Sequence, residues 1–225
     1  EEQGRFDEAL WMHTKSKQLK QTVTPDSLHL ASTFNNIGVV LFHRQEHEEA
    51  LRMYEMAREM QQRLGPDTLD LAFTLNNIGE LYLMARNQVT VADELFAEAR
   101  GIIEAQAPES PEHGDVLRNI ANVRKEEGRF DEAWELHRRA RQLLETAVPD
   151  SPVLAKTLRD MADILIQKEQ HHPALQLVQE CLTILQQPHI GICADQHPVY
   201  LKAKCQEAQL LTITNQQPVD DDLAR

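Results

Sequence analysis

Apolar residues recur at intervals of three and four along most of the chain, and short polar breaks separate the stretches. After residue 70, for example, Leu71, Leu75, Ile78 and Leu81 would share one face of a helix. No stretch shows the strict alternation of a strand. The pattern predicts ten helices, over residues 5–22, 28–43, 47–64, 69–85, 90–106, 111–127, 130–146, 152–168, 171–186 and 198–214.

The same residues return with a period of 41 or 42, so the helices form a repeat. Residues 4–9 recur unchanged as residues 128–133, and a small residue marks the start of every second helix of a pair. Another small residue lies in the middle of the first helix of each complete repeat, where we expect close packing against the second helix of the same repeat. The two sets are Ala9, Ala50, Ala92, Ala133 and Ala174, and Gly38, Gly79, Ala121 and Ala162.

A third recurring motif marks the junctions between repeats: proline, an acidic residue, then Ser or Thr, as in residues 25–27 and 66–68. Proline prevents the preceding helix from continuing, and Asp, Ser or Thr can cap the next one. The sequence therefore predicts an all-α fold, a right-handed superhelical solenoid of antiparallel helix pairs.

We expect one array over residues 1–225. It divides into partial repeat 1–24, an incomplete repeat 188–225 with an insertion of about five residues, and four complete repeats between them. The chain starts and stops inside a repeat, which suggests a piece of a longer protein. The complete repeats are residues 25–65, 66–107, 108–148 and 149–187.

Composition and charge narrow the function. The 23 basic and 36 acidic residues give a net charge of −13, which argues against nucleic acid as the main partner. No apolar run is long enough for a membrane span. Cys181, Cys193 and Cys205 form no CxxC pair and lack metal-ligand spacing with the histidines, so we expect a reducing, cytoplasmic location without metal or cofactor. No catalytic motif is present, and we expect no enzyme activity.

Residues 64–79 carry a resemblance to a known family. Their sequence, LGPDTLDLAFTLNNIG, resembles the tetratricopeptide repeats of kinesin light chains and related proteins with 42-residue units. Thr68-Leu69 departs from the family pattern, and so do Arg118-Asn119 and Arg159-Asp160. The resemblance implies that the first Asn of each Asn-Asn pair contacts the backbone of an extended cargo peptide, which carries over to Asn35 and Asn76.

The repeat register selects candidate binding residues on the concave face, which first helices line in such a solenoid. If Gly38 and its equivalents face the paired helix, the residues three before and one after them lie in the groove. Asn36, Asn77, Asn119 and Asp160 would then face the seam inside their own repeat. The predicted partner-binding residues are Asn35, Asn76, Arg118, Asn122 and Arg159.

The chemistry of these residues suggests an extended, partly acidic partner. Asn can both donate to and accept from a peptide backbone, and the Arg fork suits a carboxylate. Alternatively, they are solvated side chains bonded to neighbours such as Asp163, Glu80 or Glu126. The favoured function is a peptide-binding adaptor. The alternatives are a structural module that self-associates through its end repeats, or a regulatory arm of a larger enzyme.

Overall fold

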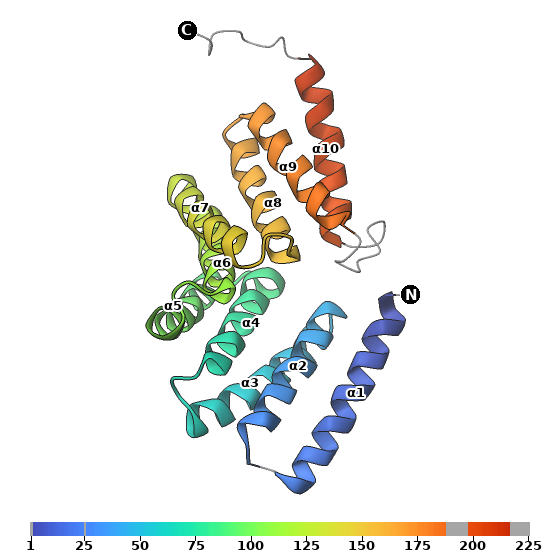
Figure 1. Cartoon of the computed structure of the whole chain (residues 1–225), viewed down its shortest axis with the longest axis vertical. Helices are drawn as coiled ribbons and strands as arrows, with labels where there is room; N and C mark the ends of the chain where they lie inside the picture. Colours follow the sequence, from blue (N-terminus) through green and yellow to red (C-terminus); the bar gives the residue numbers. More distant parts are fainter. Residues whose placement is uncertain (1, 25, 188–197, 217–225) are drawn as a thin grey trace. The chain divides into compact units, whose positions relative to one another are not determined.

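The computed structural model describes residues 2–24, 26–187 and 198–216 (Figure 1). The chain is 86% helical, and the described residues form ten helices and no strand. The all-α prediction is confirmed, and each helix begins and ends within three residues of its predicted bounds. The helices are α1 (Glu2–Val23), α2 (Leu28–His43), α3 (His47–Leu64), α4 (Leu69–Arg86), α5 (Val89–Gln106), α6 (Pro111–Glu126), α7 (Phe130–Ala147), α8 (Pro152–Gln167), α9 (His171–Leu185) and α10 (Pro198–Gln216).

The chain divides into two compact units, Glu1–Pro108 with helices α1–α5 and Glu109–Arg225 with α6–α10. In the first unit α2 packs on α3 and α4 on α5; in the second, α6 packs on α7 and α8 on α9. The helices thus form the successive antiparallel pairs that the repeat predicts. The boundary between the units coincides with a predicted repeat junction, and a single array over 1–225 stays a prediction. The predicted insertion near residues 188–197 lies outside the described residues.

The junction motif caps the first helix of each complete repeat as predicted. The hydroxyl of Ser27 accepts a hydrogen bond from the backbone N–H of Leu30, at 3.2 Å. Thr68, Ser110 and Ser151 do the same at the starts of α4, α6 and α8. Pro111 and Pro152 stand at the start of their helices, where a missing N–H costs nothing.

The turn inside each complete repeat contains one residue in the left-handed region, always at the same repeat position. Its φ is 64° at Gln45, 52° at Asn87, 76° at Gly128 and 60° at Glu169. Only one of the four is glycine, the residue that adopts this conformation without strain. The repeat geometry therefore imposes the turn even where the local sequence does not favour it.

The small residues in the first helices make room for large ones. A Cβ at Gly38 would lie 2.5 Å from the ring of Tyr54, and one at Gly79 would lie 2.5 Å from the ring of Phe96. These glycines therefore accommodate an aromatic ring of the second helix. In the next repeat, Ala121 stands in the glycine position and His137 in the aromatic one.

Candidate partner-binding site

In the first unit, an amide pair connects the successive first helices α2 and α4. The side-chain amide of Asn77 donates a hydrogen bond of 3.0 Å to the side-chain oxygen of Asn35. Asn76 is only 6% exposed and has an interaction partner of its own. The contact between α2 and α4 at this repeat position is therefore between two neutral amides.

In the second unit, the corresponding link between α6 and α8 is ionic and buried. The Asp160 carboxylate, in a residue that is 2% exposed, accepts hydrogen bonds from three donors. These are an Arg159 Nη at 2.6 Å, Asn122 Nδ2 at 3.0 Å and an Arg118 Nη at 3.4 Å. Arg118 is also bonded to Asp115 at 2.8 Å and is 5% exposed. We call Asp160 and these three donors the Asp160 cluster.

Burial and charge act in opposite directions on Asp160. Burial raises the pKa of its carboxyl group, but the positive charges of Arg159 and Arg118 outweigh that effect and hold the pKa well below its usual range. The guanidinium groups therefore keep the carboxylate ionised inside the unit. Removing either cation would leave a buried charge with less compensation.

His137 is an unusual neighbour of this cluster. It is fully buried on α7, and neither ring nitrogen has a hydrogen-bond partner among the described residues. Burial lowers its pKa to about 4, although the negative charge of Asp160 acts in the opposite direction. The imidazole is therefore neutral at physiological pH and packs as an apolar ring would.

These contacts show that the residue two before the Gly/Ala position points toward the first helix of the preceding repeat. Asn77 reaches Asn35, and Asp160 reaches Arg118 and Asn122. The prediction that Asn77 and Asp160 face the seam of their own repeat is therefore wrong, and the same prediction for Asn119 stays a prediction. Asn36, at this position on α2, is exposed.

Of the five predicted residues, the structure brings three together: Arg118, Asn122 and Arg159 meet at Asp160. Their acidic partners are Asp160 and Asp115. Asp163, an acid expected as their alternative partner, instead accepts from Gln206 of α10 and lies 3.8 Å from Lys125. Asn35 and Asn76 lie in the other unit. A joint role of all five in one groove stays a prediction.

Two lysines missed by the sequence reasoning also lie on the first helices of the second unit. Lys156 precedes Arg159 by three residues on α8, so the two share a helix face. If Ala208 of α10 is aligned with Ala162 of α8, Lys202 occupies the repeat position of Lys156. Neither ammonium group forms a hydrogen bond or ion pair within the described part of the chain. The recurrence of lysine at one repeat position is the sequence signal that could have identified these two residues.

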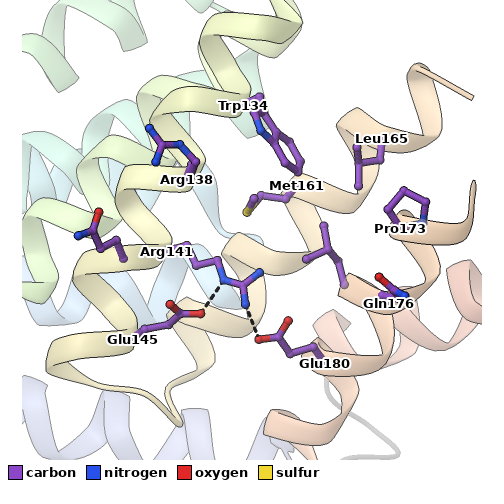
Figure 2. A pocket seen from close by; sticks show the side chains of 11 residues that line it. Trp134, Arg138, Arg141, Glu145, Met161, Leu165, Pro173, Gln176 and Glu180 are labelled. Atoms are coloured by element: carbon purple, nitrogen blue, oxygen red, sulfur yellow. Dashed lines mark hydrogen bonds and ion pairs between the residues drawn. The ribbon is translucent and has the colours of Figure 1, made fainter. Parts of the chain in front are cut away.

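A separate hollow lies over the second helices α7 and α9, with α8 beneath (Figure 2). Its volume is about 580 Å³, and Trp134, Met161 and Leu165 line its apolar part. Arg141 lies at its edge, bonded to Glu145 at 2.6 Å and Glu180 at 2.8 Å. The edge carries both signs of charge, so the hollow does not favour an acidic ligand.

Within the described ranges, no group of three or more His, Cys, Asp or Glu residues could hold a metal ion. Cys193, His189 and His197 lie outside those ranges. Cys181 is buried among apolar side chains, and burial raises its pKa to about 12. In the same described residues, no helix is both long and apolar enough to cross a membrane.

Comparison with known proteins agrees with this architecture. The tetratricopeptide repeat family matches residues 1–60, 29–105 and 112–187, so the chain belongs to this family. Repeats of this type form protein-interaction scaffolds and are typically non-enzymatic. No curated protein matches the sequence.

Two solved structures are similar to the chain. The crystal structure of BtubC (BKLC) from P. vanneervenii has a TM-score of 0.67 and 14% identity, over 96% of this chain and 94% of that one. Nearly identical TPR-like repeats of a Podosopora anserina protein described as a kinesin light chain have a TM-score of 0.59 and 18% identity, over 82% and 87%. At these identities the likeness shows the shared fold, that of kinesin light chain-like repeats.

Proposed function

We propose that this chain is an adaptor that binds an extended, partly acidic segment of a partner protein on the face formed by its first helices. The observation that carries the proposal is the pair of lysines, Lys156 and Lys202. They stand at one repeat position, on the same type of helix as Arg159, and have no acidic partner among the described residues. Partner carboxylates would supply that missing charge.

The arginines have different roles in this proposal. Arg159 is partly exposed, with a side chain that is 19% accessible, and can contact the partner directly. Arg118 and Asn122 hold Asp160, which in turn orients Arg159. A buried ion pair of this kind fixes the direction of a guanidinium group that would otherwise have many conformations.

The first unit would contribute uncharged contacts. Asn35 offers an amide that can donate to and accept from the backbone of an extended peptide without reading its side chains. Asn76 stands one repeat later, but it is 6% exposed and already has a partner, so Asn35 carries the amide contact. In the second unit, the lysines and Arg159 would select for Asp or Glu.

The experiment compares two double variants that each change the net charge by the same amount. Lys156→Glu/Lys202→Glu reverses the two first-helix lysines, and Arg138→Glu/Arg139→Glu reverses two exposed arginines on the second helix α7. The probe is a labelled Ser/Gly peptide carrying three aspartates, and its affinity is measured by fluorescence anisotropy. We expect the unmodified chain to bind in the micromolar range, about −8 kcal/mol.

The lysine variant should weaken binding by roughly tenfold or more, because it replaces charge-assisted contacts with repulsion. The arginine variant should bind within about twofold of the unmodified chain, since long-range charge is screened beyond about 8 Å at physiological salt. If only the arginine variant loses affinity, the hollow beside α7 is the binding site and the first-helix proposal fails. Equal losses would indicate a nonspecific effect of net charge and would also contradict it.

A structural or oligomerisation module is the second candidate. It is favoured by the exposure of large apolar side chains on α1, where Trp11 is 63% and Leu19 is 66% exposed. Sedimentation equilibrium over a wide concentration range separates the two functions. A constant monomer mass favours the adaptor, and a mass that rises with concentration favours assembly. The expected cytoplasmic location stays a prediction in either case.

A further inference from the structure

The hollow over α7, α8 and α9 lies inside the second unit, and the function proposed above does not use it (Figure 2). Its sides are the second helices α7 and α9, and the first helix α8 lies beneath. One further helix packs on each side, α6 on α7 and α10 on α9. The hollow is therefore bordered by two complete helix pairs, α6–α7 and α8–α9.

One end of the hollow has an apolar floor. Met161, Leu165 and Leu177 are buried, so only their outer atoms reach the surface. Trp134, near the start of α7, and Pro173, near the start of α9, stand at the sides of this end (Figure 2). This apolar recess can accept one bulky apolar side chain from outside, because the side chains that line it leave it unfilled.

Comparison with the first unit indicates why the recess is open. Leu165 stands three residues after Ala162, the small residue of α8, and the equivalent residue of α4 is Tyr82. The Arg86 guanidinium group lies over the Tyr82 ring, 5.4 Å from its centroid, so an aromatic ring with a cation above it occupies this position in α4. Leucine is smaller than tyrosine, and in the second unit the space over α8 stays open.

The other end of the hollow carries a negative charge in excess. Arg141 is bonded to Glu145 at 2.6 Å and to Glu180 at 2.8 Å, so two half-exposed carboxylates share one guanidinium group. Arg138, the other arginine at the edge, is paired with Glu135 at 2.7 Å. Among the described residues that line the hollow, one carboxylate charge is therefore left without a cation of its own.

We propose that this hollow binds an extended segment of a partner protein that has a bulky apolar side chain and, about three residues from it, a Lys or Arg. The apolar side chain fills the recess beside Trp134, and the basic group lies between Glu145 and Glu180. Pro173 and Glu180 are seven residues apart on α9, which is about 10 Å along the helix and matches the reach of about three extended residues.

An acidic segment or a second copy of the chain fits this hollow less well. An acidic residue would add a negative charge beside Glu145 and Glu180, where one is already in excess. A second copy has the same net charge of −13, so two copies repel each other. A lysine or arginine instead gives each of the two carboxylates a cation. The site thus takes the opposite charge from the first-helix face and is independent of it.

Trp134 provides a signal from the hollow itself, because it is the only tryptophan left in a Trp11→Phe chain. The probe is the end-blocked peptide Lys-Gly-Ser-Phe-Ser-Gly-Lys, which has a lysine three residues from Phe on both sides and can therefore bind in either direction. Saturating peptide should shift the fluorescence emission of Trp134 to shorter wavelength, since the Phe ring replaces water beside the indole. A peptide with Ser in place of Phe should cause no shift.

Variants of the Trp11→Phe chain test the charged end. Glu145→Gln/Glu180→Gln should weaken binding of the lysine peptide roughly tenfold or more, because Arg141 then repels the lysine. The matched control Glu126→Gln/Glu132→Gln removes two exposed acids outside the hollow and should leave the affinity within about twofold.

A peptide with Glu in place of both lysines should show the reverse preference. It should bind the Glu145→Gln/Glu180→Gln chain more tightly than the chain that keeps both acids, because Arg141 is then free to pair with it. A gain of affinity cannot result from a loss of folding.

The proposal is overturned if saturating lysine peptide leaves the emission of Trp134 unchanged, or if the two double variants bind this peptide equally. An emission that changes with the concentration of the chain alone, and no longer does so in Glu145→Gln/Glu180→Gln, would show that a second copy occupies the hollow and would also contradict it. Lys156→Glu/Lys202→Glu should bind the lysine peptide as tightly as the chain without these changes, so this proposal and the acidic-peptide proposal can fail separately.

Discussion

In both units a polar contact links successive first helices at the same pair of repeat positions, but the chemistry of the contact differs between the units. The first unit uses two neutral amides, Asn35 and Asn77, whereas the second uses Arg118 and a buried Asp160 carboxylate. The fold therefore constrains where the link lies and leaves its charge free to vary.

The difference in charge between the two links affects which groups of each unit can bind a ligand. In the second unit Asp160 and Asp115 already engage Arg118, so this arginine has less to offer a ligand, whereas Lys156 on α8 and Lys202 on α10 have no acidic partner among the described residues. In the first unit the link between first helices is uncharged, and the amide of Asn35 remains suited to a peptide backbone. The comparison suggests that the ionic link serves the rigidity of the second unit and that its neighbours serve recognition.

The largest expected effect comes from breaking the ionic link. Arg118→Ala should lower the free energy of unfolding by about 3 kcal/mol, the lower end of the range for removing one partner of a buried ion pair, because Arg159 and Asn122 still hold Asp160. The matching change in the first unit, Asn35→Ala, should cost only about 1 kcal/mol. Urea denaturation of the two variants measures both values, and equal losses would contradict the proposed difference between the units.

Lowering the pH should decrease the stability of the second unit and not that of the first. The pKa of buried His137 is about 4, below the ordinary value of 6.5, so the unfolded state takes up the proton first as the pH falls. Stability is unaffected above about pH 6.5 and decreases between 6.5 and 4, by about 3 kcal/mol in total. The first unit has Tyr54 and Phe96 at the equivalent positions, and neither titrates in this range.

His137→Val introduces the residue that the next repeat has at this position, Val178, and should abolish this pH dependence. Variants that retain one tryptophan report on each unit, since Trp11 lies in the first and Trp134 in the second. A pH dependence that persists in His137→Val would show that another group causes it.

Overpacking should have the next largest effect. Gly79→Leu places a side chain against the ring of Phe96 and should cost about 2–3 kcal/mol. Glu80→Leu, one residue further along α4 and only partly buried, should cost well under 1 kcal/mol. Identical melting temperatures for the two variants would mean that the faces of α4 are assigned wrongly.

The smallest effect belongs to an exposed pair. Arg138 and Glu135 lie 2.7 Å apart, but their side chains are 65% and 62% exposed. Arg138→Ala should therefore change the unfolding free energy by no more than about 0.5 kcal/mol. A loss close to that of Arg118→Ala would show that burial does not decide the contribution of an arginine in this chain.

The helices could be predicted from the sequence because their signals are local. Junction prolines, capping residues such as Ser27 and apolar residues at helical spacing each act within a few positions. The contacts between the residues of the candidate site could not be predicted from local signals. Asp160 meets Arg118 across 42 residues, and the direction of its side chain depends on how two helix pairs stack.

One sequence signal could still have identified this contact. Where the first unit has Asn at both linked positions, the second has Arg118 and, one repeat later, Asp160. A complementary exchange of charge at two positions one period apart indicates a contact between them. The aromatic residues opposite the glycines carry a similar signal, because Tyr54 and Phe96 face glycine whereas smaller residues stand opposite alanine.

The most direct test of the proposed binding face is lysine footprinting with the acidic peptide. The chain is treated with an amine-modifying reagent in the presence and absence of peptide, and the modification of each lysine is measured by mass spectrometry. Lys156 and Lys202 should lose most of their reactivity when the peptide is bound, whereas exposed Lys15 on α1 should keep it. Unchanged reactivity at Lys156 and Lys202 under saturating peptide, or equal protection of Lys15, would contradict binding on the first helices of the second unit.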